Sequence, residues 1–206
     1  MLLFYADAHS YFDMLLTAYE RLKEDIQAVF LLGDQCPEKD LKTILQPIKC
    51  PVKFILGNHD ADRAYWLRNQ FSLWEDHLHC KVIQVGDLRV AGLSGVFRGK
   101  IWHPGYTHYW DTRKELMDFQ KMRKAEGFHG WLPRKHWASI FPEDYNLLLD
   151  TQADILITHE APECHRCGFP ILGELAELMG VKTIIHGDHH EFYRDSLKNE
   201  IQVIGL

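Results

Sequence analysis

The chain has 206 residues, of which 46% are hydrophobic and 25% are charged, a balance that is usual for a soluble globular enzyme with one sizeable domain. No run approaches the ~18 apolar residues that span a bilayer, and the N-terminus lacks the basic region of a signal peptide, so we expect a cytoplasmic protein without a membrane partner. The net charge is −6, but the charges are unevenly distributed, because residues 98–135 carry nine Lys/Arg against four Asp/Glu. This segment is interpreted as a local anion site or as a solvated helix face. The acidic remainder of the chain argues against broad binding of duplex nucleic acid.

The first third of the chain alternates between apolar runs and amphipathic segments. The apolar runs predict strands and the segments with helical spacing predict the helices between them. The strands are expected at residues 2–5, 28–32 and 52–56, and the helices at residues 11–24, 41–45 and 62–70. This alternation is typical of βαβ units with a parallel sheet.

After residue 80 the alternation of strands and helices ends, and two closely spaced strands are predicted. Residues 81–85 and 88–91 predict a hairpin around the Gly86-Asp87 turn. Later elements are a helix that ends before Gly180 and three strands, the last of which pairs after a turn near residues 198–199. The strands are expected at residues 154–157, 183–185 and 201–204, and the helix at residues 171–179.

Residues 95–150 are rich in aromatic and basic side chains, with several prolines and glycines. We interpret them as a cap-like insertion in a single domain of residues 1–206, with one helix at about 112–126, because a structureless loop of this length is uncommon in a compact protein. The insertion has the side chains to stack on a nucleobase and hold phosphates, but a buried cap or a dimer surface explains the rings equally well.

Five cysteines, an odd number, are scattered along the chain and do not predict a disulfide framework. Two of them, Cys164 and Cys167, form a lone CxxC pattern. A zinc ribbon needs a second pair, so reduced thiols in a loop are favoured over a zinc or redox site.

Polar side chains that bind metals follow five of the predicted buried strands. They are Asp7 and His9, then Asp34, then Asn58, His59 and Asp60, then His159, and finally Asp188, His189 and His190. The carboxyl ends of strands in an open α/β sheet gather at one edge, and clustered charges there need compensation. Divalent metal ions supply it, and an Asp, Asn and His set suits Mn, Fe, Zn or Ni. The other histidines are expected at the surface or in the core; they include His77, His79, His103, His108, His129 and His136.

The ordered series D-x-H, GD, GNHD, a lone histidine and a glycine-rich histidine turn resembles the calcineurin-like metallophosphoesterase superfamily. The resemblance spans residues 7–190 and implies an α/β fold, a four-layer α/β/β/α sandwich, with two divalent metal ions at the sheet edge. It implies one metal held by Asp7, His9, Asp34 and His190, and a second held by Asp34, Asn58, His159 and Asp188. It also implies that His59 lies beside the site and that Asp60 orients it.

One position departs from the pattern of that superfamily, because Asp188 replaces the first histidine of G-H-x-H. We expect an altered second metal site that favours a harder ion such as Mn. A ligand swap that uses His186 or His189 is the alternative.

The chemistry that follows is hydrolysis of phosphate mono- or diesters in a small phosphorylated or nucleotide substrate. Two metal ions ~3.5–4 Å apart generate hydroxide from a bridging water, neutralise ester oxygens and align the attack. His59 is then the candidate general acid or electrostatic stabiliser of the leaving group, and its alternative is a turn histidine bonded to Asp60. Arg98 and His165 are candidate substrate contacts. A binding protein inactivated by Asp188, or a nuclease, is the alternative function.

Overall fold

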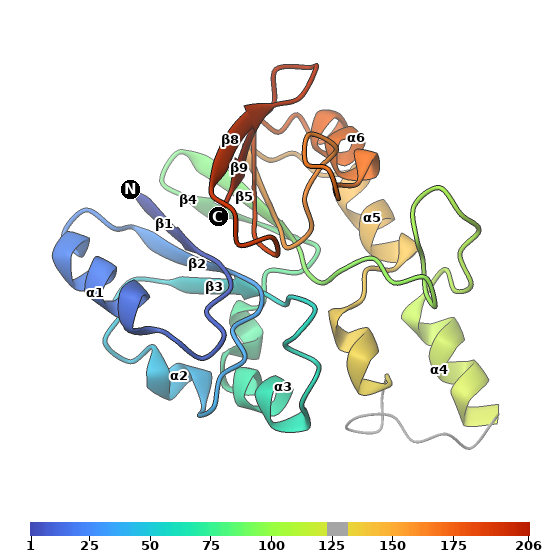
Figure 1. The fold of residues 1–206 in the computed structure, drawn as a ribbon, viewed down its shortest axis with the longest axis horizontal. Coiled ribbons are helices and arrows are strands. Elements are labelled where there is room, and N and C mark those ends of the chain that lie inside the picture. Colours follow the sequence, from blue (N-terminus) through green and yellow to red (C-terminus); the bar gives the residue numbers. More distant parts are fainter. Residues whose placement is uncertain (123–131) are drawn as a thin grey trace.

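The computed structural model describes residues 1–122 and 132–206, and nine strands within these residues form two sheets (Figure 1). The first sheet is parallel, with its three strands in chain order, and pairs Phe4 with Phe30 and Leu31 with Phe54. Its strands are β1 (Leu2–Tyr5), β2 (Ala28–Leu32) and β3 (Val52–Ile55).

The second sheet is mixed and has the strand order β4-β5-β6-β7-β9-β8. Its four central strands are parallel, and an antiparallel hairpin closes each edge. The strands are β4 (Lys81–Val85), β5 (Leu88–Leu93), β6 (Ile155–Thr158), β7 (Thr183–His186), β8 (Tyr193–Ser196) and β9 (Gln202–Gly205).

Helices cover the outer face of each sheet. The first sheet carries α1 (Asp13–Leu22), α2 (Leu41–Ile44), α3 (Ala64–Gln70) and the 3-10 helix η1 (Phe71–Asp76). The second carries α5 (Pro142–Leu149) and α6 (Pro170–Leu178), with α4 (Arg113–Met122) beyond them (Figure 1). The 3-10 helix η3 (Arg134–Ala138) packs on η1 through Trp137, and its Ala138 is buried in the apolar cluster of the first sheet.

Alternate side chains of β2 explain why the layers stack in this order. Val29 and Leu31 pack against the helices of the first sheet, whereas Phe30 and Leu32 pack against β5, β6 and β7 of the second. A strand that is buried on both faces needs a continuous apolar run, and β2 is such a run. The two sheets pack on each other through this apolar interface, and helices cover their outer faces. This arrangement is the expected four-layer α/β/β/α sandwich.

The predicted elements are present with their ends shifted by at most a few residues. The helix expected at 112–126 is confirmed as α4 over its described part, while its end, Trp131 and His129 lie outside the described residues. Gly180 follows α6 with a φ of 68°, as a helix C-terminal glycine should.

Four elements were not predicted: the 3-10 helices η1 and η3, helix α5 and strand β8. Helix α5 lies inside the expected insertion, and its leucines, Leu147, Leu148 and Leu149, are consecutive and do not show a helical spacing. Strand β8 is an exposed edge strand with the polar sequence YRDS, although the turn at residues 198–199 and the pairing with β9 were expected.

The segment at residues 95–150 shares its core with the second sheet. Phe97, Ile101 and Phe141 are buried in the same apolar cluster as Leu156 and Ile184 of β6 and β7. We therefore infer a single domain of residues 1–206 in which this segment is an insertion. No described helix is both long and apolar enough to cross a membrane.

Candidate metal centre

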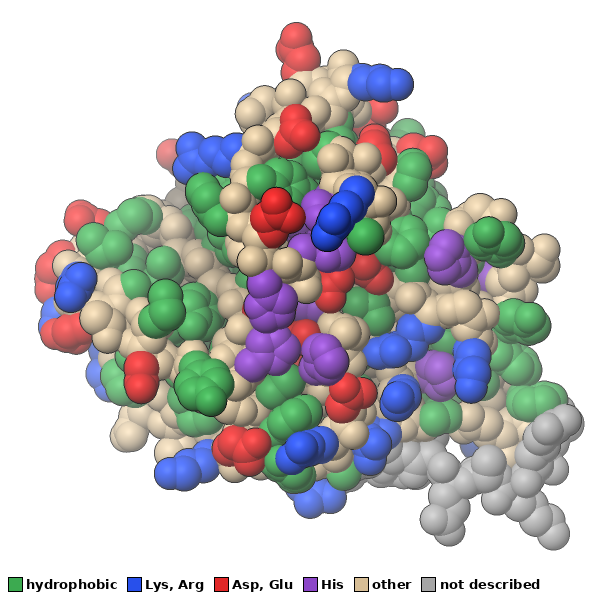
Figure 2. All heavy atoms as spheres, in the orientation of Figure 1, with side chains coloured by type: hydrophobic (Ala, Val, Ile, Leu, Met, Phe, Trp, Pro, Cys, Tyr) green, Lys and Arg blue, Asp and Glu red, His purple; other side chains and the backbone are tan. Residues whose placement is uncertain are grey.

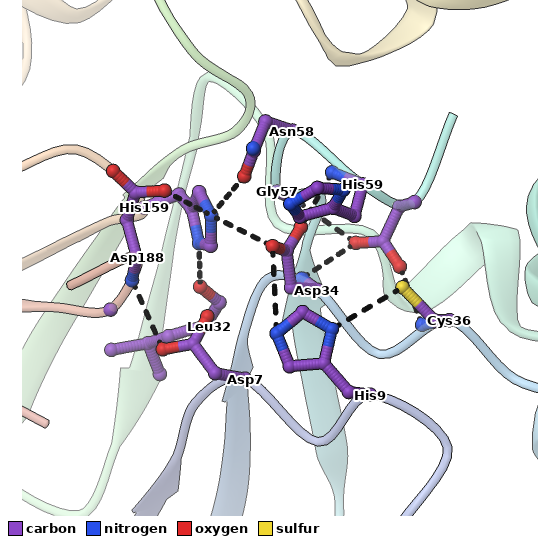
Figure 3. Close-up of polar contacts among 12 residues, drawn as sticks. Asp7, His9, Leu32, Asp34, Cys36, Gly57, Asn58, His59, His159 and Asp188 are labelled. Atoms are coloured by element: carbon purple, nitrogen blue, oxygen red, sulfur yellow. Dashed lines mark hydrogen bonds and ion pairs between the residues drawn. The ribbon is translucent and has the colours of Figure 1, made fainter. Parts of the chain in front are cut away.

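The turns that follow five strands converge and carry side chains with metal-binding atoms, most of which are labelled in Figure 3. These turns come from both sheets, so the site lies where the two sheets end together. The side chains are Asp7 and His9 after β1, Asp34 after β2, Asn58 after β3, His159 after β6, and Asp188 and His190 after β7.

Left-handed backbone conformations hold most of these residues. Asp7, Asp34 and Asp188 have φ angles of 53°, 54° and 73°, and His9 and His190 have φ angles of 41° and 51°. Such conformations cost a non-glycine residue about 1–3 kcal/mol and cluster at functional sites. The surrounding contacts therefore hold the turns in conformations that these residues would not adopt alone.

Two glycines make room for His159 between the sheets. A Cβ at Gly33, which has a φ of 99°, would lie 2.3 Å from Nδ1 of His159. A Cβ at Gly57 would lie 2.2 Å from Oδ1 of Asp34 and 2.5 Å from the His159 ring. The glycines of the GD and GNHD turns are thus required by the close approach of this imidazole.

One group of donor atoms consists of Asp7, His9 and His190, whose ligand atoms lie within 4.8 Å of one another. The two imidazole rings are stacked at 10°, with 3.3 Å between their Nε2 atoms. Nε2 of His9 also lies 4.0 Å from Oδ2 of Asp34. Two imidazole nitrogens and nearby carboxylates form an N/O ligand set that suits a divalent transition metal.

A second group consists of Asp7, Asp34 and His159, again within 4.8 Å. Nδ1 of His159 donates to the carbonyl of Leu32 at 2.7 Å, so the lone pair of Nε2 faces the site. That Nε2 lies 3.6 Å from Oδ2 of Asp34 and 3.4 Å from Oδ1 of Asp188. Asp188 therefore reaches the place where the superfamily pattern has a histidine.

Asn58 gives the clearest test of whether these residues fit a metal ion. The atom of its amide that points inward lies 3.0 Å from both His159 Nε2 and Asp34 Oδ2, and 3.2 Å from Asp188 Oδ1. With the amide oxygen inward and Nε2 of His159 unprotonated, four acceptor atoms face one another, which is favourable only around a cation. Without a cation, the amide nitrogen can turn inward and donate to them.

Protonation of the His159–Asp34 pair shows the same need for positive charge. Burial opposes the charged form of His159, but Asp188 and Asp34 outweigh burial and raise its pKa well above the ordinary value. Burial likewise opposes the charged form of Asp34, but His159 outweighs it and lowers its pKa. When no metal ion supplies positive charge, the carboxylates of Asp34 and Asp188 therefore favour the protonated form of His159.

Asp34 lies between the two groups of donor atoms. Its Oδ1 accepts the backbone N–H of His59 at 2.8 Å, which leaves Oδ2 facing both His9 and His159. This geometry is consistent with the bridging role that the resemblance implies. Asp7 is also common to both groups.

Asp60 does not orient His59, which corrects the sequence interpretation. Its fully buried carboxylate accepts four hydrogen bonds at 2.8–2.9 Å, from the backbone N–H groups of Asp34, Cys36 and Gly57 and from the Gln70 side chain. Asp62 instead lies 2.8 Å from Nδ1 of His59. Asp60 therefore links the GD and GNHD turns, and a turn histidine bonded to Asp60 is excluded.

His59 lies at the rim of the site, with about half of its side chain exposed (49%). Its ring centroid is 5.7 Å from that of His9, in an edge-to-face arrangement. Because Asp62 holds Nδ1, the Nε2 side of the ring is directed toward Asn58, whose amide atom is 3.3 Å away. A ring held in this way can exchange a proton at Nε2.

The two candidate substrate contacts differ in their distance from the centre. Arg98 donates from Nη2 to the carbonyl of Asn58 at 3.1 Å, so it adjoins the GNHD turn. His165 is separated from Asp188 by His189. Its ring stacks on the His189 ring with 3.9 Å between centroids, and Nε2 of His189 lies 3.7 Å from Oδ2 of Asp188. The structure thus brings Arg98 close to the metal centre and leaves His165 at its periphery.

A ligand swap through His186 is not supported. Both ring nitrogens of His186 are engaged, with Tyr193 Oη at 2.6 Å and the carbonyl of Gly187 at 2.9 Å. Asp188 itself points at the centre, and His189 stands behind its carboxylate.

Asp62 and Glu160 were missed by sequence reasoning. Glu160 is buried next to His159 and accepts the N–H of Phe97 at 3.0 Å, and burial followed by the charge of Asp188 raises its pKa to about 7. Each of the two acids follows a predicted ligand or turn in the sequence, but nothing in that spacing shows where its carboxylate points.

A third group of metal-binding side chains, His79, Cys80 and Asp144, lies elsewhere. Arg113 donates to Asp144 Oδ2 at 2.8 Å, and its Nη2 lies 3.1 Å from His79 Nε2. The guanidinium already supplies the positive charge, so this group is an ion-pair network within the fold.

The fold and the centre together define a metal-binding α/β/β/α sandwich, the class of the metal-dependent phosphoric ester hydrolases. The model of the calcineurin-like phosphoesterase family matches residues 1–192, and the chain belongs to that family, which generally uses two divalent metals. A Haemophilus influenzae protein described as uncharacterized is 36% identical over 212 residues, covering 100% of this chain and 91% of that protein.

Solved structures share the fold at low sequence identity. A dimetal phosphatase from Danio rerio has a TM-score of 0.60 and 13% identity, with 100% of this chain and 86% of that chain covered. The NAD nucleotidase NadN of Haemophilus influenzae has a TM-score of 0.52 and 14% identity, with 100% of this chain but 44% of that chain covered. At these identities the likeness establishes the fold alone.

Proposed function

We propose that this protein is a dinuclear metal-dependent phosphoesterase that hydrolyses a phosphate ester in a small phosphorylated or nucleotide substrate. The observation that carries the proposal is the convergence of four acceptor atoms, from Asn58, His159, Asp34 and Asp188, on one point beside a second N/O group. His59 stands at the rim of both groups, where a leaving group would depart.

The metal ligands are proposed as the resemblance assigns them. Asp7, His9, Asp34 and His190 would hold one ion, and Asp34, Asn58, His159 and Asp188 the other. When bound, two such ions supply a hydroxide near neutral pH and neutralise the ester oxygens. We propose Mn as the ion, because Asp188 adds a hard oxygen ligand at the second site; Fe, Zn or Ni would also fit the ligand set.

The other roles belong to side chains of the chain itself. Asp62 fixes the His59 ring so that Nε2 can give a proton to the leaving oxygen or stabilise its charge. Arg98, fixed to the Asn58 carbonyl, would contact a phosphate oxygen. Asp60 keeps the two turns in register through four accepted hydrogen bonds. His165 remains a proposed outer contact.

We also propose the substrate class, which is a small phosphorylated compound or a nucleotide. The NAD nucleotidase that shares the fold is named for a nucleotide substrate, and the dimetal phosphatase for a phosphatase activity. A cytoplasmic location is likewise a proposal that cell fractionation would test.

The test is hydrolysis of p-nitrophenyl phosphate, bis-p-nitrophenyl phosphate and a nucleotide panel by the Mn-loaded protein. Wild type should turn over at least one of these, and Asp34→Asn should lose most of that activity because it removes the shared carboxylate charge. Lys198→Ala, an exposed change at the β8–β9 turn, serves as the control. Failure of the wild type with every substrate would reject the phosphoesterase proposal in favour of a binding protein.

A further inference from the structure

A groove of about 700 Å³ adjoins the metal centre and is lined by residues 97–100 and 133–136. Figure 2 shows Lys and Arg side chains gathered beside a group of histidines on this face of the molecule. The groove is formed by the segment before α4 and by the segment that begins η3, both within residues 95–150. Its size suits a small molecule, since ligand pockets are usually ~300–1,000 Å³.

The lining of the groove is strongly cationic. It includes Arg98, Lys100, Arg134 and Lys135, and no Asp or Glu is among the described residues that line it. Lys100 is exposed and forms no ion pair within residues 1–122 and 132–206. Lys135 makes only a distant contact, at 3.9 Å, with Asp62. Four cations with so little neutralisation favour binding of an anion.

The two arginines are fixed to the same turn that carries Asn58 and His59. Arg98 donates to the carbonyl of Asn58. Arg134 donates from Nε to the backbone carbonyl of Ala61 and from Nη2 to the backbone carbonyl of Asp62, each at 2.9 Å. Nε of Arg98 is buried and has no hydrogen-bond partner among the described residues. The turn is therefore a wall shared between the metal centre and the groove.

His136 does not add to the positive charge of the groove. Burial is the main cause that lowers its pKa to about 4, and Arg98 and Lys100 lower it further. Its Nδ1 lies 3.1 Å from Oγ of Ser139. The charge of the groove is therefore that of two guanidinium and two ammonium groups at neutral pH.

We propose that this groove binds a second phosphate group of the substrate, so that the substrate is a small molecule with at least two phosphates. This inference rests on the proposed function, which places one phosphate at the metal centre. The second phosphate lies between Lys100 and Lys135, which are free to close on it, while Arg98 and Arg134 form the fixed wall. A long polyanion is disfavoured because the chain outside residues 98–135 has a net charge of −11.

The test compares adenosine 3′,5′-bisphosphate with adenosine 5′-monophosphate as substrates of the Mn-loaded protein. Wild type should prefer the bisphosphate by at least tenfold in kcat/KM. In the Lys100→Ala/Lys135→Ala variant this preference should fall about tenfold, and the loss should lie in KM for the bisphosphate. Lys198→Ala should keep the preference of the wild type, and thermal melting should show that each variant is folded.

Equilibrium binding of the same two nucleotides keeps this test independent of turnover. If no substrate is hydrolysed but the bisphosphate binds more tightly and the double variant removes that difference, the proposed function fails and the phosphate site stands. If hydrolysis occurs with equal preference for the two nucleotides, the phosphate site is rejected and the proposed function stands. Tighter competition by a single-stranded oligonucleotide than by the bisphosphate would reject the small-molecule substrate.

Discussion

His59 reaches the edge of the metal centre with its ring held from the outside. The contact between Nδ1 and Asp62 at 2.8 Å leaves Nε2 for the leaving group. A positioned histidine that transfers a proton contributes about 10²–10⁴-fold to a rate. The His59→Gln variant should therefore lose about 10²-fold in kcat, while the number of bound metal ions stays the same.

Asp62→Asn provides the matched comparison, because it keeps the size of the side chain and removes its charge. It should lower kcat by less than His59→Gln. Full activity of His59→Gln on a substrate with a poor leaving group would show that His59 has no part in the reaction.

The aspartate at position 188 is placed to act as a ligand. Its Oδ1 lies 3.4 Å from His159 Nε2, on the same side as the amide of Asn58. We predict that Asp188→Ala loses one metal ion per chain and most turnover, whereas Asp188→His keeps turnover within about tenfold. A gain of several orders of magnitude in Asp188→His over an inactive wild type would instead show that the aspartate disables the centre.

The sequence is a good guide to which side chains lie together at the site, and a poorer guide to the contacts that each of them makes. Each candidate ligand follows a buried strand, and parallel strands end at one edge, so the convergence of Asp7, Asp34 and His159 could be predicted. The assignment of Asp60 to His59 was wrong because adjacency along the chain does not set side-chain direction. At this turn Asp60 points inward to four N–H groups, and Asp62 faces the ring.

At the scale of elements, one buried carboxylate joins α4, α5 and the segment before β4. Asp144 in α5 is bonded to Arg113 of α4, lies 3.1 Å from Nε2 of His79, and accepts the N–H of Phe141 at 2.8 Å. Burial alone would raise its pKa, but His79 and Arg113 outweigh burial and hold the pKa well below its ordinary value. Its contribution to stability is thus present above ~pH 4 and lost as the pH falls.

Asp144→Ala should lower the free energy of unfolding by about 3–5 kcal/mol, because it leaves the largely buried Arg113 guanidinium without its main partner. Urea unfolding at pH 7 measures this change. Asp118→Ala is the control, since Asp118 pairs with Lys114 on the exposed face of α4 and should change the stability little. Equal effects of the two substitutions would contradict the buried network.

The elements themselves were predictable where burial dictates the residue pattern. β2 is buried on both faces and reads as a continuous apolar run, so its bounds were predicted without error. β8 has one exposed edge and a polar sequence, so neither alternation nor composition marks it. Helix α5 has its leucines in one consecutive run, which does not show a helical spacing, and it is held by Asp144 and by packing on α6.

At the scale of the whole molecule, the metal centre connects the two sheets. Asp7, His9, Asp34 and Asn58 follow strands of the first sheet, and His159, Asp188 and His190 follow strands of the second. The two sheets otherwise meet through an apolar layer around Phe30 and Ile157. Bound metal ions would therefore cross-link the sheets at the edge where the apolar layer ends.

The central claim is that this edge holds two metal ions that the reaction requires. The most direct measurement is the number of metal ions per chain after dialysis and reloading with Mn, with hydrolysis of a phosphodiester followed in parallel. We predict two ions per chain and turnover that appears as the second ion binds. One ion per chain without turnover would contradict it and would identify Asp188 as the substitution that removed the second site.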